Sequence, residues 1–488
     1  MTAEPSTPDT APPDRAATLV AAPGALPLLG HAWQLRFRPL RFLDSLCGQA
    51  DLVALRLGPV PGYLVNHPRL VHELLVVRHQ EFTKTGSPLW ETVRVLVGNG
   101  LGTSEGETHL RQRRALQPLF HPHRMEHYAR IMTAVAEERS AAWQGGQLLC
   151  VDREMYRIAA AALTRCLYSV RLPDDAVHEI TTHLPVAFAG VGKRAALPVG
   201  WLHALPTREN RAYATAVRRL HALVTQLVDG RRQDPTPSPD LLTALLAARD
   251  EHTGRPLSEQ QIHDEVMTLL LAGTDTTAAL LSWTLHLLGA HPDVDRRLNT
   301  ELRRELGDRP PTLEDLPRLG LLRRVVAETL RLYPPAWLTP RRAATDARLG
   351  GHRIPEGAYV FYSPYALHHA PGHHPRPDRF DPDRPEGELS YTGTGHAFLP
   401  YGAGPHKCIG NAFSLAQVHL ALATILPRWR LRPEPSYTVR PRAFTTLSPG
   451  PLPRGGGRGA RPRRGGAAPP PAGGGATTGA ARGGGGGG

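Results

Sequence analysis

The sequence predicts a mainly α fold with a small β region, an α+β arrangement in a single large domain with a long central helix. Amphipathic helical spacing recurs along most of the chain. Strand-like alternation is confined to a few short stretches, of which residues 51–66 are the clearest. No segment repeats with a period of about 20–50 residues, which argues against a solenoid.

Length and composition are consistent with one large domain, or with two to three smaller ones, between two polar ends. The chain has 488 residues, of which 41% are hydrophobic, and this suffices for a sizeable core. Residues 1–25 and 451–488 are rich in Pro, Ala, Gly or Arg and poor in apolar side chains, so we expect a disordered leader and a disordered tail around a domain at 26–450. The net charge is +13, and six arginines of the tail contribute much of it.

Cysteine usage and hydropathy bear on location. The four cysteines are far apart and form no CxxC pair, which argues against a disulfide framework or a zinc knuckle and favours a reducing, cytoplasmic setting. No apolar run reaches the roughly 18–20 residues that a membrane span requires. The start of the chain lacks the pattern of a signal peptide.

The predicted elements follow in chain order. Residues 51–66 read as a β-hairpin around a Gly/Pro turn, and Pro68 begins a helix that we expect to run to residue 82. Further amphipathic helices are expected at 109–120, 123–143 and 210–232.

The longest predicted helix covers 258–292. Ser258 can cap it, with Gln261 at the capping-box position. Its centre is unusual, because Gly273 costs about 1 kcal/mol relative to alanine and the residues after it, 274–277, are poor helix formers. A polar, weakened turn between two apolar halves conflicts with the surrounding pattern, and such conflicts are typical of functional sites.

A glycine-rich stretch, "FLPYGAGPHKCIG" at 398–410, surrounds Cys408. His406 and Lys407 add positive charge, and the strongly helical segment that follows places Cys408 just before a helix N-terminus, where an anion is favoured. A phosphate-binding loop would need a different spacing, and Pro405 lacks an amide donor. The stretch therefore favours a site for a sulfur anion.

Glu328 and Arg331 lie three positions apart in a helix that ends before Pro334, so they share one face. Most such pairs are surface salt bridges worth less than about 1 kcal/mol. Here apolar neighbours surround the pair, so a buried structural pair is the alternative.

Four motifs, "AGTDTT", "ETLR", "PDRF" and "YGAGPHKCIG", stand in this order along the chain. In order and spacing they resemble the cytochrome P450 family of haem-thiolate monooxygenases, and the resemblance extends over residues 27–448. Within the family the chain most resembles bacterial, actinomycete-type members that oxidise terpenes.

The resemblance implies roles for individual residues. Cys408 would be the axial ligand of the haem iron. The acid–alcohol pair of the distal helix would be Asp275 and Thr276, which would relay protons for oxygen activation, while Gly273 would leave room for dioxygen. The remaining implied residues are the haem-propionate contacts His109, Arg113, Arg341 and His406; the loop residues Tyr401, Gly402, Gly404 and Gly410; the buried ion network Glu328, Arg331 and Arg379; and the substrate contacts Leu271, Ala272, Ala336, Trp337 and Leu338.

The resemblance also implies the cofactor, the partners and the substrate class. The cofactor would be haem b, with electrons from NAD(P)H delivered by a separate ferredoxin and ferredoxin reductase. Lys407, Arg111 and Arg114 are candidate docking charges, and no nucleic acid, no membrane span and a monomer are expected. The substrate would be an apolar small molecule, with a sesquiterpene-like hydrocarbon of secondary metabolism favoured over a fatty acid.

Other interpretations remain open at this point. "GTSEG" at 102–106 fits the G-x-S-x-G pattern of serine hydrolases, with Ser104 as nucleophile. Four histidines at 368–374 could bind a metal, although solvated histidines on an exposed loop are the simpler interpretation. "DDAVH" at 174–178 is an incomplete version of a terpene-cyclase motif. A peroxide-driven enzyme or a haem sensor would have less need of Asp275 and Thr276.

Overall fold

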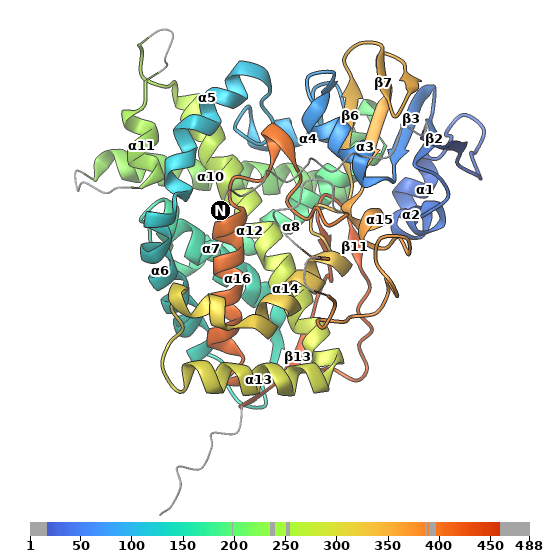
Figure 1. Cartoon of the computed structure of the whole chain (residues 1–488). Helices are drawn as coiled ribbons and strands as arrows, with labels where there is room; N and C mark the ends of the chain where they lie inside the picture. The colour runs from blue at the N-terminus through green and yellow to red at the C-terminus, as the bar shows by residue number, and fades with distance from the viewer. Residues whose placement is uncertain are drawn as a thin grey trace, which may run out of the picture.

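The computed structural model describes residues 17–197, 199–234, 240–249, 254–385, 388–389 and 397–458. Helices make up most of this part of the chain, and the central helix α12 (Glu259–Ala290) runs through their middle. The main sheet lies to one side of the helical body (Figure 1). The predicted mainly α fold with a small β region is confirmed.

The other α-helices are α1 (Ala32–Phe37), α2 (Pro39–Leu46), α3 (Pro68–His72), α4 (Pro88–Val97), α5 (Gly106–Leu116), α6 (Pro122–Ala141), α7 (Val151–Leu167), α8 (Asp174–Ala196), α9 (Gly200–Ala204), α10 (Arg208–Gln233), α11 (Leu241–Ala247), α13 (Pro292–Leu306), α14 (Gly320–Leu332), α15 (Pro364–His368) and α16 (Asn411–Ile425). Short 3₁₀ or π turns are η1 (Glu73–Val77), η2 (Gln117–Phe120), η3 (Leu313–Arg318) and η4 (Gly404–His406).

The strands are β1 (Leu19–Ala21), β2 (Leu52–Leu57), β3 (Val60–Val65), β4 (Phe82–Thr83), β5 (Leu148–Cys150), β6 (Thr339–Ala343), β7 (Ala347–Leu349), β8 (His352–Ile354), β9 (Tyr359–Tyr362), β10 (Trp429–Pro433), β11 (Arg442–Ala443), β12 (Leu447–Ser448) and β13 (Pro453–Arg458). The main sheet has the order β1-β2-β3-β9-β6-β4, and a smaller sheet has the order β10-β13-β5. β2 and β3 form the predicted hairpin, with Leu57 opposite Val60 at its turn.

The central helix begins as its sequence predicts. The Ser258 hydroxyl accepts from the Gln261 amide, and the Gln261 side chain accepts from the Ser258 amide, which completes the capping box. By length and composition, α12 and the segment Gly404–Ile425 could each cross a membrane. Most of the apolar residues in both are buried inside the protein, as in core helices, because α12 packs against α7 and α16 packs against α6.

The predicted helix at 68–82 is shorter than expected. It starts at Pro68, with the His67 side chain accepting from the Arg69 amide. It then passes into the π turn η1, ends at Val77, and is followed by β4. The hydrophobic spacing that predicted a longer helix serves instead to bury Leu74 and Leu75 in this turn.

The predicted domain limits need correction at both ends. β1 lies within the predicted leader and pairs in parallel with β2. β13 lies within the predicted tail and pairs with both β10 and β5. Glycines 455–457 have no apolar side chains that would predict a strand. Their order comes from backbone hydrogen bonds between β13 and the two neighbouring strands. The rest of both segments, 1–16 and 459–488, lies outside the described residues.

β13 carries a buried cation, Arg454, which is 2% exposed. Its guanidinium donates to Nδ1 of His286 on α12, its Nε has no partner in the described part of the chain, and no carboxylate is paired with it. Burial lowers the pKa of Arg454, and burial together with this cation lowers the pKa of His286 to about 4. Burying a charge without a counter-charge costs stability.

We therefore expect Arg454→Met to raise the free energy of unfolding by about 1–4 kcal/mol. Arg432→Met, at an exposed position of the neighbouring strand β10, is the matched control and should change it by less than about 0.5 kcal/mol. Urea unfolding of the two variants and the wild type measures both values. A less stable Arg454→Met protein would contradict the assignment of an uncompensated charge.

Candidate functional site

A cavity of about 330 Å³ lies between α12, α5 and the loop before α16. Cys408 lines it, and because protein surrounds this residue on its other sides, the exposed surface of Cys408 faces the cavity. Of the residues proposed from the sequence, the cavity walls also include His109, Arg113, Ala272, Gly273, Thr276, Ala336, Arg341, Tyr401, Gly402, His406, Lys407 and Gly410. The fold thus brings together segments from four distant parts of the chain.

The loop before α16 is shaped by glycines at positions that favour them. Gly402 and Gly404 both have φ of +69°, in the left-handed region. At Gly404 a Cβ atom would lie 2.0 Å from the carbonyl oxygen of Leu75, so a side chain is excluded there. The Cys408 amide donates to the Tyr401 carbonyl oxygen over 3.0 Å, and this bond closes the loop.

Cys408 lies three residues before Asn411, the first residue of α16, as the sequence predicts. Burial raises the pKa of the thiol, whereas the Gly410 amide and the cations of Arg113 and Lys407 lower it. Burial outweighs these groups, so the pKa of the thiol is raised overall, and a metal ion at the sulfur would be needed to hold it as a thiolate.

Basic side chains gather on one wall of this cavity. They are Lys84, His109, Arg113, Arg341, His406 and Lys407, and among the residues that line the described cavity there is no aspartate or glutamate. Burial lowers the pKa of His109, Arg113 and His406. A wall of arginines, lysines and neutral, hydrogen-bonding histidines without acids is suited to an anionic ligand that carries its own carboxylates.

His109 and Arg113 of α5 also fix the cysteine loop. The ring nitrogens of His109 lie 3.2 Å from the carbonyl oxygens of Leu101 and Pro405, and Arg113 Nη1 donates to the Lys407 carbonyl oxygen over 2.8 Å. The rings of His109 and His406 lie 4.1 Å apart, centre to centre. One helix thus supplies both cavity charges and support for the loop.

Lys84 was missed by the sequence interpretation. It is 3% exposed, and its ammonium donates to the carbonyl oxygens of Gly102 and Ser104 over 2.9 and 3.1 Å. Burial and the nearby Arg341 lower its pKa to about 7. Only the short motif "FTKTG" marks it in the sequence, and nothing in that motif shows that the lysine turns inward.

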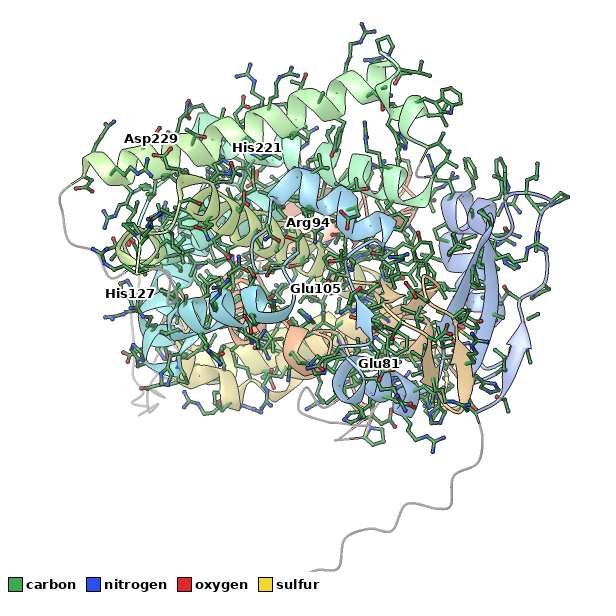
Figure 2. All side chains as sticks on the ribbon, turned by 90° about the horizontal axis from the view of Figure 1, so that it is seen from above. Glu81, Arg94, Glu105, His127, His221 and Asp229 are labelled. Atoms are coloured by element: carbon green, nitrogen blue, oxygen red, sulfur yellow. The ribbon has the colours of Figure 1, made fainter. Side chains whose placement is uncertain are left out.

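The loop that Lys84 contacts connects α4 to α5 and is held from several sides. Arg94 donates to the Thr103 carbonyl oxygen over 3.0 Å, and Glu105 accepts from the Thr85 amide over 3.1 Å. Figure 2 shows Arg94 and Glu105 on this side of the molecule, seen from above. From α12, the Glu265 carboxylate accepts from the Leu101 amide over 3.0 Å.

These residues fit the haem that the resemblance implies. A soft sulfur ligand faces the cavity, an acid-free basic wall suits the two carboxylates of the group, and the remaining walls are largely apolar. Within the described chain, no cluster of three or more His, Cys, Asp or Glu residues forms a separate metal site.

The acid and the alcohol of α12 point in different directions. Thr276 lines the cavity, and its hydroxyl donates to the Ala272 carbonyl oxygen over 2.7 Å. Asp275 is 3% exposed and does not line the cavity; its Oδ1 accepts from the hydroxyl of Tyr156 on α7. Burial raises the pKa of Asp275 to about 6, and the hydroxyls of Thr446 and Tyr156 oppose that rise.

Gly273 has a packing role that the sequence did not reveal. A Cβ atom at this position would lie 2.2 Å from Cδ1 of Leu163, a side chain of α7 that also lines the cavity. The space beside Gly273 therefore accommodates Leu163, where the expectation was room for dioxygen. An alanine here would require that leucine to move.

The predicted substrate contacts divide into two groups. Ala272 and Ala336 line the cavity, but Leu271 is buried away from it, and Leu269 lines it instead. Trp337 and Leu338 line a second, apolar cavity of about 450 Å³, between α1, the end of α8 and the main sheet. The three contacts at Leu271, Trp337 and Leu338 are therefore not part of the wall around Cys408.

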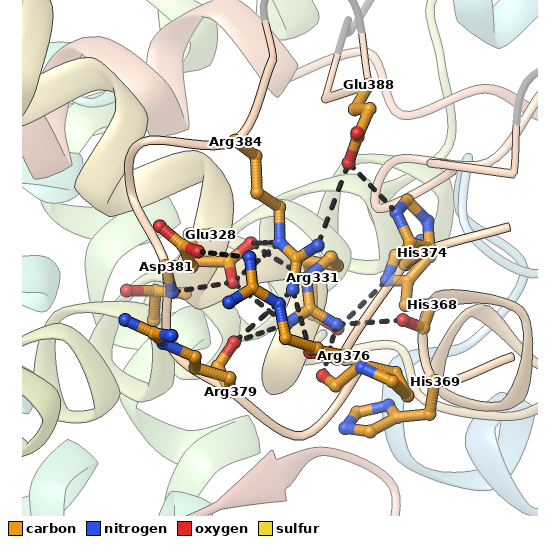
Figure 3. A network of polar contacts seen from close by, with 12 residues as sticks. Glu328, Arg331, His368, His369, His374, Arg376, Arg379, Asp381, Arg384 and Glu388 are labelled. Carbon is orange, nitrogen blue, oxygen red and sulfur yellow. Dashed lines mark hydrogen bonds and ion pairs between the residues drawn. The ribbon is translucent and has the colours of Figure 1, made fainter. Parts of the chain in front are cut away.

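Glu328 and Arg331 form the buried pair that was the alternative to a surface bridge. Both side chains are 0% exposed, and Arg331 donates to the two carboxylate oxygens over 2.7 and 2.8 Å. The third member is Arg384, whose Nε donates to the same carboxylate over 3.0 and 3.1 Å (Figure 3). The predicted member, Arg379, is exposed and contributes only its carbonyl oxygen, which accepts from Arg331 over 3.1 Å.

The expectation that the histidines at 368–374 are solvated is wrong for two of them, His368 and His374. His368 is fully buried and joins the ion network to the cysteine loop, since its Nδ1 lies 3.2 Å from the Arg331 carbonyl oxygen and its Nε2 accepts from the Leu399 amide over 3.0 Å. His374 is 2% exposed. Burial lowers the pKa of both histidines, so they pack as neutral rings.

Two rival motifs lack the surroundings that their chemistry needs. Ser104 is 2% exposed, and its hydroxyl donates to the amide oxygen of Gln112, which is no general base. Asp174 and Asp175 occupy the exposed first turn of α8, where Asp174 pairs with Arg139 over 3.3 Å. A buried serine is typical of a packed loop, and two aspartates are typical of the first turn of a helix, where the helix dipole favours negative charge.

Comparison with known proteins gives a consistent result. The family model described as cytochrome P450 matches residues 21–452. The chain is 44% identical to cyclooctatin synthase of Streptomyces melanosporofaciens over 88% of this chain and 94% of that protein. It is 42% identical to cyclooctat-9-en-7-ol 5-monooxygenase of the same organism (91% and 96%) and 39% identical to pentalenene oxygenase of Streptomyces avermitilis (87% and 94%). Its fold matches the crystal structure of the cytochrome P450DA heme domain with a TM-score of 0.80 at 29% identity, over 92% of this chain and 99% of that one.

Proposed function

We infer that this chain, which belongs to the cytochrome P450 family of haem monooxygenases, inserts one oxygen atom from O₂ into an apolar terpene or terpene alcohol. The observation that carries the proposal is the cavity itself, in which Cys408 and Thr276 line one space with an acid-free basic wall. The substrate class is supported by the relatives, whose names are those of a pentalenene oxygenase and a cyclooctat-9-en-7-ol monooxygenase.

The cavity residues would hold haem b. Cys408 would ligate the iron as a thiolate, and His109, Arg113, Arg341, His406 and Lys84 would pair with the propionates. Tyr401 and Gly402 would shape the loop beside the sulfur. When bound, the haem supplies the activation of O₂ and the insertion of the oxygen atom.

The residues of α12 would manage protons and water. Thr276 lines the cavity, and because its proton goes to the Ala272 carbonyl oxygen, its hydroxyl oxygen can accept a hydrogen bond from a water molecule held there. Asp275 precedes Thr276 on α12 and faces away from the cavity. Burial raises its pKa to about 6, so near neutral pH its carboxyl group can both take up and release a proton. The apolar residues around Thr276, including Leu269 and Leu280, would limit the access of bulk water.

We expect Thr276→Val to divert electrons from product to hydrogen peroxide and to lower the product yield per NAD(P)H at least about 10-fold, because one proton-handling group contributes about 10²–10⁴-fold to such steps. Thr284→Val is the matched control: Thr284 also donates to the carbonyl oxygen four residues earlier in α12, but it is buried away from the cavity. Product and peroxide are quantified per NAD(P)H oxidised. Equal yields in the two variants would refute a proton role for Thr276.

Substrate class is tested by titrating the ferric protein with pentalenene, cyclooctat-9-en-7-ol and dodecanoic acid while its haem absorption spectrum is recorded. We expect the terpenes to shift the iron from low to high spin at micromolar concentration, because the cavity walls away from the basic side are apolar. A shift produced by dodecanoic acid alone would favour the fatty-acid alternative.

Electrons would come from NAD(P)H through a ferredoxin and a ferredoxin reductase, because membership of the cytochrome P450 family implies an external supply of electrons. Arg114 is exposed on α5, next to the helix face that supports the cysteine loop, and with Arg111 and Lys407 it is our candidate for ferredoxin docking. We propose a monomer in the cytoplasm, in keeping with four free cysteines, which suit a reducing compartment.

A further inference from the structure

The acid behind the cavity wall is held by a residue of another helix. Tyr156 lies on α7, which packs along α12, and its hydroxyl donates to Oδ1 of Asp275. The other carboxyl oxygen, Oδ2, has no hydrogen-bond partner in the described part of the chain. The phenol therefore holds Oδ1 of the carboxyl on the α7 side of α12, while the neighbouring Thr276 faces the cavity.

We propose that Tyr156 is the positioning residue that holds the Asp275 carboxyl behind the cavity wall through its hydrogen bond to Oδ1. The proposal rests on the proposed function, in which Asp275 supplies protons toward Thr276. Burial and the adjacent Asp275 raise the pKa of Tyr156 well above its usual value. The phenol therefore stays neutral and donates its hydrogen bond to the carboxylate without adding a second negative charge.

Few other groups act on this pair. The ionisable group nearby is Asp152, one turn earlier on α7, which also raises the pKa of Tyr156. Asp152 itself is occupied, since its Oδ1 accepts from the Leu452 amide over 2.8 Å. From the turn between β11 and β12, the hydroxyl of Thr446 lowers the pKa of Asp275. The hydroxyls of Thr446 and Tyr156 therefore both stabilise the charged form against burial, and Tyr156 donates to Oδ1 from α7.

Removal of the Tyr156 hydroxyl should change the pKa of Asp275 in a defined direction. The Tyr156 hydroxyl stabilises the ionised carboxylate, so its removal favours the protonated form and raises the pKa of Asp275. Tyr156→Phe should move the titration of Asp275 upward by about 0.5–1 pH unit, which is the effect of one lost hydrogen bond.

The experiment is an infrared titration of the ferric, haem-loaded full chain between pH 4 and 9 (about that range suffices for a group near neutrality). The carbonyl stretch of a protonated carboxyl is followed, and the band of Asp275 is identified as the one missing in Asp275→Asn. The matched control is Tyr168→Phe. Tyr168 ends the same helix, is 0% exposed, and donates to the Val266 carbonyl oxygen of α12 over 2.9 Å, so its exchange removes a buried phenol from the same interface without touching Asp275.

We expect the band to titrate higher in Tyr156→Phe and as in the wild type in Tyr168→Phe. An unchanged midpoint in Tyr156→Phe, or equal shifts in both variants, would overturn the proposal. The two proposals fail separately: if Asp275→Asn forms product as well as the wild type does, the proton role of Asp275 is refuted, whereas the infrared midpoints still decide whether Tyr156 positions its carboxyl.

Discussion

Cys408→Ser should remove the strongly red-shifted Soret band from the spectrum of the reduced, carbon-monoxide-bound protein. A serine hydroxyl in the same loop would not ionise near neutral pH and is a hard ligand, so it cannot replace the thiolate as a donor to iron. Cys408 is the cysteine that lines the basic cavity, so we expect the Cys408→Ser protein to lose the red-shifted band completely.

Cys166→Ser is the control for this exchange. Cys166 is 3% exposed on α7, where its thiol donates to the Tyr128 carbonyl oxygen, so the substitution also replaces a buried cysteine but leaves the cavity intact. The control protein should keep its band. If Cys408→Ser kept the band as well, thiolate ligation by Cys408 would be wrong.

Arg384→Met should lower the free energy of unfolding by about 3–5 kcal/mol, because it leaves the fully buried carboxylate of Glu328 with one of its two cations missing. The same substitution at Arg379, whose side chain is exposed, should cost less than about 0.5 kcal/mol. Urea unfolding of the two variants in parallel distinguishes them.

The comparison of Arg384 with Arg379 tests which arginine pairs with the Glu328 carboxylate. A large loss at Arg379 and a small one at Arg384 would restore the assignment made from the sequence. His368 connects this network to Leu399, at the start of the cysteine loop, so we also expect Arg384→Met to bind haem less tightly than Arg379→Met.

The sequence predicted those features whose signals are local. The capping box at Ser258 and the position of Cys408 before α16 depend on residues within a few positions of one another, and both are confirmed. The conflict at 273–277 correctly marked the helix turn that reaches the cavity.

Features that depend on packing were not predictable in this way. Between residues 377 and 384 the tripeptide Pro-Asp-Arg occurs at 377–379 and again at 382–384, and only the chain path shows that the second of these arginines turns inward. Leu271 and Leu269 are equally apolar, and the rotation of α12 decides which one lines the cavity. Nothing near Lys84 or Tyr156 in the sequence shows that these side chains turn toward the site, because their partners lie on elements farther along the chain.

The pairing of β13 with β5 has a consequence for how the protein is made. Leu452, just before β13, binds Asp152 in the first turn of α7 across a separation of 300 residues. During synthesis, β5 must wait for almost the whole domain to leave the ribosome before its partner exists, and until then an open strand edge is exposed to other nascent chains. The helix that carries Tyr156 packs mainly against α12, which is made earlier, and β13 adds the last of its contacts.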